Sequence, residues 1–169
     1  YIYDSVFNKP NSYQISLKDD ENTFYKKRVA FLEDNLHTNY FVQDIGNFEI
    51  INTIKEFYHD KEILDVCAAP GGKSILLSTY GFKVEALDKS QSQIDKFKQN
   101  IKRLSIDIKI VKKDFLSAKI NRRYNSILLD APCSALGTFR RNPDVISKID
   151  KKKLKVNQDI QVKMIDKSL

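Results

Sequence analysis

Acidic, glycine-containing and thiol-bearing segments recur along this chain at the points where short apolar runs end. The first apolar run, residues 63–66, leads into Cys67 and a loop with two adjacent glycines. Later apolar runs end at or close to Asp88, Asp114 and Asp130. A single acid in such a place is usually a helix cap or a solvated turn residue. Several of them indicate a binding site, because ligands of open parallel sheets bind at the carboxyl ends of the strands.

The glycine-containing loop has residue types suited to holding a bound group. Gly71 and Gly72 let the backbone approach a ligand closely, and a helix that begins directly after them would present N–H donors at the positive end of its dipole. Asp88 follows Cys67 by 21 residues, where a Rossmann-like fold uses an acid to accept the ribose hydroxyls. The pattern favours a cofactor that contains a nucleoside, with Asp114 facing the adenine. A plain turn from strand to helix is the alternative for the two glycines.

A phosphate-binding P-loop is a second interpretation of the same region. Gly72, Lys73 and Ser74 match the end of the P-loop pattern, and the run 127–130 resembles the acid-tipped strand that holds magnesium beside it. The pattern also requires a glycine five residues before Gly72, where this chain has Cys67. We expect a cysteine to disfavour the backbone conformation that glycine permits there. The match therefore fails at a defining position, and a P-loop-like nucleotide-binding protein is kept as an alternative function.

Two longer stretches resemble a known enzyme family. Residues 64–74, with the sequence LDVCAAPGGKS, are similar to the first motif of the RNA cytosine-C5 methyltransferases of the Sun/Fmu group. Residues 129–144, which begin LDAPCS, are similar to the fourth motif of that family. Residues 42–44, VQD, match the approach to the first motif in the bacterial branch. The resemblance covers about residues 42–165.

The resemblance implies an S-adenosylmethionine-dependent methyltransferase of Rossmann-like fold, whose cofactor lies along the strand ends. By position, Asp88 would hold the ribose, Asp114 would hold the adenine, and Asp130 would lie between the cofactor and the target base. The residues that would wrap the methionine part of the cofactor are Cys67, Ala68, Ala69, Pro70, Gly71, Gly72 and Lys73. The implied substrate is RNA, in particular small-subunit (16S) ribosomal RNA.

The family's reaction requires a cysteine thiolate that adds to C6 of cytosine, which makes C5 able to take the methyl group. A carboxyl group that hydrogen-bonds N3 favours this addition by stabilising the charge that develops in the ring, and Asp130 is the candidate for it. The resemblance implies that Cys133 assists product release, while the nucleophile belongs to a later Thr-Cys-Ser motif. These 169 residues contain no such motif. We therefore expect them to be part of a longer protein, truncated before that motif, and inactive in methyl transfer by themselves.

Three further residues complete the candidate site. Arg140 and Arg141, in the continuation of the fourth motif, are candidates for contacts to RNA phosphates. Cys67 belongs to the cofactor loop, where a small packed residue is the simplest interpretation. Because the nucleophile motif is absent, a non-catalytic module that binds RNA or the cofactor is a further alternative.

The elements that must position these residues alternate between strands and helices. Short apolar runs predict strands at 63–67, 83–87, 108–111 and 126–129, and helical spacing predicts helices at 48–58, 73–80, 90–104 and after Pro143. Gly81 is placed for a left-handed helix C-cap. This alternation predicts an α/β fold with a parallel sheet and right-handed crossovers. In it, the strands that end near Cys67 and Asp130 should be parallel neighbours, with Asp88 and Asp114 at the same edge.

The chain is predicted to have two parts. Residues 46–169 are predicted to form the methyltransferase catalytic domain, incomplete at its C-terminus. Residues 1–45 are polar and weakly patterned, and we interpret them as a small N-terminal appendage, the remnant of an RNA-binding subdomain. Within the appendage, alternating residues predict short strands at 13–17 and 28–32.

The composition limits the partners and the compartment. A balance of 29 Lys+Arg against 22 Asp+Glu gives a net charge of +7, and the basic residues are mostly lysines, 23 against 6 arginines. A solvated lysine-rich surface explains this charge as well as a surface that attracts a polyanion. No apolar run approaches the roughly 18 residues of a membrane span, and two cysteines cannot form a disulfide framework or a four-ligand zinc site. We predict a cytoplasmic protein with no membrane or metal partner.

Overall fold

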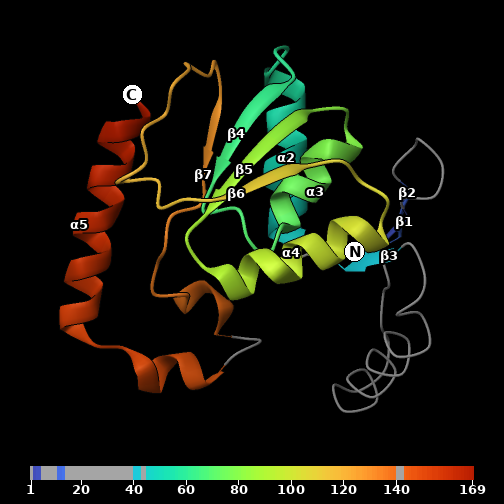
Figure 1. The fold of residues 1–169 in the computed structure, drawn as a ribbon. Helices are drawn as coiled ribbons and strands as arrows, with labels where there is room; N and C mark the ends of the chain where they lie inside the picture. Colours follow the sequence, from blue (N-terminus) through green and yellow to red (C-terminus); the bar gives the residue numbers. More distant parts are fainter. Residues whose placement is uncertain (1, 5–10, 14–39, 43–44, 140–142) are drawn as a thin grey trace, which may run out of the picture.

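The computed structural model describes residues 2–4, 11–13, 40–42, 45–139 and 143–169. Its centre is a sheet of four strands in the order β6-β5-β4-β7 (Figure 1). These strands are β4 (Glu62–Val66), β5 (Lys83–Asp88), β6 (Lys109–Lys112) and β7 (Ile127–Leu129). β4 pairs in parallel with both β5 and β7, and β5 pairs in parallel with β6. The predicted α/β class and the neighbouring of the strands that end near Cys67 and Asp130 are confirmed.

Three helices pack on one face of this sheet. They are α2 (Ile45–Phe57), α3 (Gly72–Thr79) and α4 (Gln91–Arg103). Apolar residues at helical spacing turn towards the strands, so that Ile51, Leu77 and Phe97 are fully buried in the cluster between the helices and the sheet. Ile63 and Val84 of the central strands belong to the same cluster. This packing holds the segment between β4 and α3 against α4.

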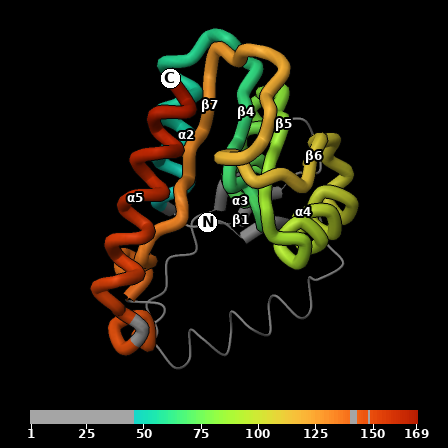
Figure 2. The backbone as a smooth tube through the Cα atoms, turned by 60° about the vertical axis from the view of Figure 1, so that its left-hand side comes forward, coloured from blue at the N-terminus to red at the C-terminus, as the bar shows by residue number. Residues whose placement is uncertain are grey.

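A single long helix, α5 (Lys151–Ser168), covers the opposite face (Figure 2). Its Met164 is buried in a second apolar cluster with Leu64 and Val66 of β4, because alternate residues of a strand point to opposite faces. Asp150 caps the helix by accepting a hydrogen bond of 2.9 Å from the Lys152 N–H. Among the described residues, no helix combines the length and the apolar character needed to cross a bilayer.

The boundaries predicted from the sequence agree with the structure to within three residues for all four strands and for α2, α3 and α4. The helical tail expected after Pro143 begins as a 3-10 helix, η2 (Pro143–Lys148), and continues as α5; another 3-10 helix, η1 (Leu136–Thr138), precedes it. The predicted C-cap is also confirmed. Gly81 has a φ of 82°, and the Phe82 N–H donates to the Leu77 carbonyl, which closes α3 in the manner of a Schellman motif.

Short N-terminal strands form a second, antiparallel sheet in the order β2-β1-β3. They are β1 (Ile2–Asp4), β2 (Asn11–Tyr13) and β3 (Tyr40–Val42). Of the strands predicted here, the one at 28–32 lies outside the described residues, as does all but Tyr13 of the one at 13–17. The division of the chain at residue 45 stays a prediction.

A buried carboxyl group links the central strand to α3. Asp65 of β4 is 1% exposed, and its Oδ2 accepts a hydrogen bond of 2.6 Å from Oγ of the buried Ser74. Its other oxygen, Oδ1, is buried without a partner among the described residues. Burial raises the pKa of Asp65 to about 7, and the bond from Ser74 offsets only part of this effect. The cause is the unfavourable transfer of a carboxylate into an apolar interior.

We expect the variant Asp65→Asn to lose part of the pH dependence of stability. An acid whose pKa is raised on folding stabilises the fold below its unfolded pKa of about 4, and this contribution is lost as the pH rises towards 7. Urea unfolding should be measured at about pH 4 and about pH 8. The unfolding free energy of the variant minus that of the parent should be larger at the higher pH, by roughly 1.4 kcal/mol per unit of pKa shift, because only the parent loses stability as Asp65 ionises. Asp107→Asn, at an exposed site, serves as control. A difference between Asp65→Asn and the parent that is the same at both pH values would contradict the assignment.

Candidate functional site

The carboxyl ends of the four parallel strands meet at one edge of the sheet (Figure 1). Cys67 follows β4, Asp88 is the last residue of β5, and Asp114 lies two residues after β6. Asp130 follows β7 directly, with Cys133 three residues beyond it. The expected gathering of the strand-end acids at one edge is confirmed.

The segment between β4 and α3 makes a tight turn against α4. Gly71 has a φ of 105°, and a Cβ there would lie 2.4 Å from the Phe97 ring, so both the backbone conformation and the close approach require glycine. Cys67 has a φ of 66°. Cys67 therefore does adopt the left-handed conformation that cysteine was expected to disfavour, and it does so at an energetic cost. The Ala68 N–H donates to the Leu87 carbonyl at 3.0 Å, and this bond to β5 helps to offset the roughly 1–3 kcal/mol that a non-glycine residue pays in this region.

The carboxylate of Asp88 joins two loops at the edge. Its Oδ2 accepts a hydrogen bond of 3.1 Å from the Ala69 N–H, and its Oδ1 accepts one of 2.8 Å from the Ser90 N–H. Each carboxylate oxygen can accept more than one hydrogen bond. Asp88 is therefore held in place by the main chain and still has the capacity to accept hydroxyl groups of a ligand.

Asp114 begins a compact turn after β6. Its Oδ1 accepts the Leu116 N–H at 3.0 Å, and its carbonyl accepts the Ala118 N–H at 2.8 Å. The next residue, Phe115, is 3% exposed and anchors the turn in the apolar cluster under α5. The Asp114 carboxyl group is consequently fixed at the rim of the sheet, with its second oxygen unpaired among the described residues.

An ion pair connects the start of α3 to the end of β7. Lys73, in the first turn of α3, has its Nζ 2.6 Å from Oδ2 of Asp130. The lysine side chain is 16% exposed and the aspartate side chain 56% exposed, so the pair opens to solvent on the aspartate side. Lys73 was predicted to belong to the cofactor loop, and its pairing with Asp130 was not predicted. The predicted pairing of the strands that end near Cys67 and Asp130 was the signal that could have indicated this ion pair.

The two cysteines differ in environment. Burial and, after it, the negative charges of Asp88 and Asp65 raise the pKa of the Cys67 thiol to about 11. Its thiol therefore stays protonated at neutral pH and is a poor nucleophile. Cys133 is exposed, and its Sγ accepts a hydrogen bond of 3.4 Å from the Ala135 N–H. Cys133 is thus the more accessible of the two thiols.

The position of Ser74 argues against the P-loop interpretation. A P-loop requires this hydroxyl to reach a magnesium ion, whereas Ser74 is fully buried and donates to Asp65. Lys73, which a P-loop would direct to phosphates, contacts Asp130 instead. The loop is built to pack against its own sheet.

One residue that contacts the site, Gln161, was not predicted from the sequence, and the predicted phosphate contacts lie outside the described residues. Gln161 of α5 donates from Nε2 to the Pro132 carbonyl at 2.8 Å, within the segment that links Asp130 to Cys133. A glutamine in a helix gives no signal of a carbonyl partner 29 residues away. The predicted phosphate contacts Arg140 and Arg141 lie outside the described residues.

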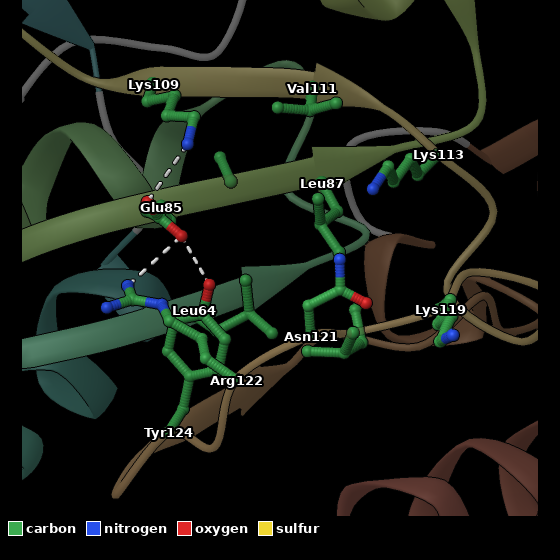
Figure 3. A pocket seen from close by; sticks show the side chains of 12 residues that line it. Leu64, Glu85, Leu87, Lys109, Val111, Lys113, Lys119, Asn121, Arg122 and Tyr124 are labelled. Carbon is green, nitrogen blue, oxygen red and sulfur yellow. Dashed lines mark hydrogen bonds and ion pairs between the residues drawn. The ribbon is translucent and has the colours of Figure 1, made fainter.

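A cavity of about 330 Å³ lies on the face of the sheet that α5 also covers (Figure 3). Its polar lining is largely paired internally, since Glu85 contacts Lys109 and Arg122 and accepts a hydrogen bond from Tyr124. None of the residues predicted to bind a cofactor lines this cavity. The candidate site is therefore the open edge of the sheet.

Comparisons with known proteins agree with the motifs. Residues 53–169 match the family model described as 16S rRNA methyltransferase RsmB/F. The ribosomal RNA small subunit methyltransferase B of Photorhabdus laumondii is 39% identical over 109 residues, which cover 62% of this chain and 25% of that protein. The protein of the same name from Proteus mirabilis is 36% identical over 117 residues, which cover 66% of this chain and 26% of that protein.

A solved structure agrees as well. NSun6 from Pyrococcus horikoshii, determined with SFG, superposes with a TM-score of 0.67 at 25% identity, over 92% of this chain and 38% of that one. The chain spans about a quarter of the length of the curated relatives it matches. The resemblance drawn from the two motifs is confirmed. Because the family model matches well over half of its residues, this chain belongs to the 16S rRNA methyltransferase RsmB/F family.

Proposed function

We propose that the protein to which these 169 residues belong transfers a methyl group from S-adenosylmethionine to C5 of a cytosine in small-subunit ribosomal RNA. The observation that carries the proposal is the single sheet edge that combines the glycine-containing loop, the anchored Asp88 and the segment 130–133. Membership of the RsmB/F family supports the substrate class. The same proposal implies a cytoplasmic protein.

The residues at the edge fit S-adenosylmethionine. Asp88 is an oriented carboxylate that can accept the ribose hydroxyls. The turn at Gly71 has no room for a side chain and leads into the amino end of α3, where the helix dipole favours a negatively charged group such as the methionine carboxylate. Asp130 suits the positively charged methionine end of the molecule, with its sulfonium and amine, whereas the Asp114 carboxylate can accept a hydrogen bond from the amino group of the adenine. When bound, the cofactor supplies a methyl group activated by its sulfonium.

Asp130 and Cys133 are the residues that we propose to act on the base. Oδ2 of Asp130 is held by Lys73, while Oδ1 has no partner among the described residues and can accept a hydrogen bond from N3 of a cytosine once that nitrogen is protonated as charge develops in the ring. We propose that Cys133, being exposed, assists release of the product, as the resemblance implies. The protonated state of the Cys67 thiol supports a packing role for that residue in the loop.

The basic character of the chain supports an RNA partner. The net charge is +7, and Lys151, Lys152 and Lys153 are exposed at the start of α5. Binding that depends on such charges weakens as salt rises, because phosphate contacts release counterions. A non-catalytic module that binds only the cofactor or RNA is the competing function, and an RNA-methylation assay on the intact reading frame distinguishes the two.

We expect Asp88→Ala to weaken binding of S-adenosylmethionine by about 10- to 150-fold, the effect of losing a hydrogen bond to a charged group. Isothermal titration calorimetry on the chain measures this directly. Asp107→Ala removes the same charge from an exposed position outside the edge and should bind like the parent. Because Asp88 also holds the Ala69 and Ser90 amides, circular dichroism must first show that the variant is folded. Unchanged affinity in a folded Asp88→Ala would contradict the cofactor site.

We also predict that these 169 residues bind the cofactor without methylating RNA, because the resemblance assigns Cys133 to product release and the Cys67 thiol is protonated. The measurement is incorporation of labelled methyl groups into ribosomal RNA by the chain and by Cys133→Ser. No incorporation by either protein, with cofactor binding retained, is the expected result. Methylation that disappears in Cys133→Ser would overturn the prediction and identify Cys133 as the nucleophile.

A further inference from the structure

Helix α5 contacts two separate loops of the candidate site through polar side chains. Gln161 donates to the Pro132 carbonyl at 2.8 Å. Lys167, six residues further along the helix, donates from Nζ to the Leu116 carbonyl at 3.0 Å and to the Ala118 carbonyl at 2.6 Å. One rigid helix therefore holds both the loop after β7 and the turn after β6.

The contact of Gln161 lies at the centre of the loop that carries the proposed chemistry. Pro132 lies between Asp130 and Cys133 in the chain. A hydrogen bond that holds its carbonyl therefore restrains both of these residues. Among the described residues, no other element hydrogen-bonds to the main chain of residues 131–133. Gln161 is half-buried and lies one helical turn before the buried Met164.

Lys167 holds the main chain in the same way on the other side of the edge, where Asp114 is proposed to contact the adenine. Its two carbonyl acceptors belong to the turn that Asp114 begins. Its ammonium also lies 5.4 Å from the centroid of the Phe115 ring, within the range of a cation–π contact. The lysine thus closes the turn from outside, and Phe115 anchors the turn from inside.

We propose that Gln161 and Lys167 are positioning residues, through which α5 sets the places of the 130–133 loop and of the Asp114 turn relative to each other. The inference rests on the proposed function only in taking these two segments as parts of the methyl-transfer site. Gln161 acts on the segment of Asp130 and Cys133, whereas Lys167 acts on the Asp114 side. Their loss should therefore affect different properties of the site.

The first test follows the loop itself by hydrogen exchange and by the rate of Cys133 alkylation. Gln161→Met keeps the size of the side chain and removes the donor. We expect exchange at residues 131–136 to rise about three- to tenfold, the range for one lost neutral hydrogen bond, and Cys133 to be alkylated faster. Gln161→Lys, which restores a donor on a slightly longer stem, should recover most of the protection. The matched control is Gln158→Met, at an exposed position of the same helix.

The second test separates the two contacts. Lys167→Met should weaken S-adenosylmethionine binding by about three- to tenfold and raise exchange at residues 114–118, with Lys163→Met as the exposed control. Exchange in β4 and β5 should stay unchanged in every variant.

The outcomes separate the proposal from its premise. Unchanged exchange at 131–136 in Gln161→Met, or a rise spread over the whole sheet, would overturn the positioning role. Failure of the parent chain to bind the cofactor would instead refute the proposed function, and the exchange results for the loop would stand.

Discussion

The parallel hydrogen bonding of β4 to β5 on one side and to β7 on the other is the constraint on which the rest of the structure depends. Parallel strands must all end at the same edge, so every segment that follows a strand is delivered there. β4 is thereby placed next to β7, and Lys73 can reach Asp130 across 57 residues of sequence. Helices α2, α3 and α4 pack on one face of the sheet and α5 packs on the other, and both layers hold the strands in place.

Main-chain hydrogen bonds and close packing fix the segments at the edge. Asp88 accepts two amide hydrogen bonds from the loops on either side of it, and Gly71 is pressed against Phe97. On the other face, α5 holds the remaining loops through Gln161 and Lys167. A site whose polar groups are already oriented loses less entropy when a ligand binds.

Much of this arrangement could be predicted from the sequence, because the signals were local. Apolar runs followed by a glycine-containing loop or by an aspartate predicted the strands, and apolar residues at helical spacing predicted α4. Contacts that depend on tertiary neighbours gave no such signal, as in the bond from Gln161 to Pro132. The positive φ of Cys67 gave no signal either, because the bond from the Ala68 N–H to the Leu87 carbonyl, which helps to offset its cost, depends on the neighbouring strand.

The central claim is that the strand-end edge, and not the cavity on the α5 face, binds S-adenosylmethionine. The most direct measurement is a titration of the cofactor into isotope-labelled chain, followed through the backbone amide NMR signals. Our account predicts the largest shifts at residues 67–72, at Ser90 and at 114–116, with small ones at Arg122 and Tyr124 in the cavity. Shifts concentrated around the cavity, or none at the edge when the cofactor is in large excess, would contradict it.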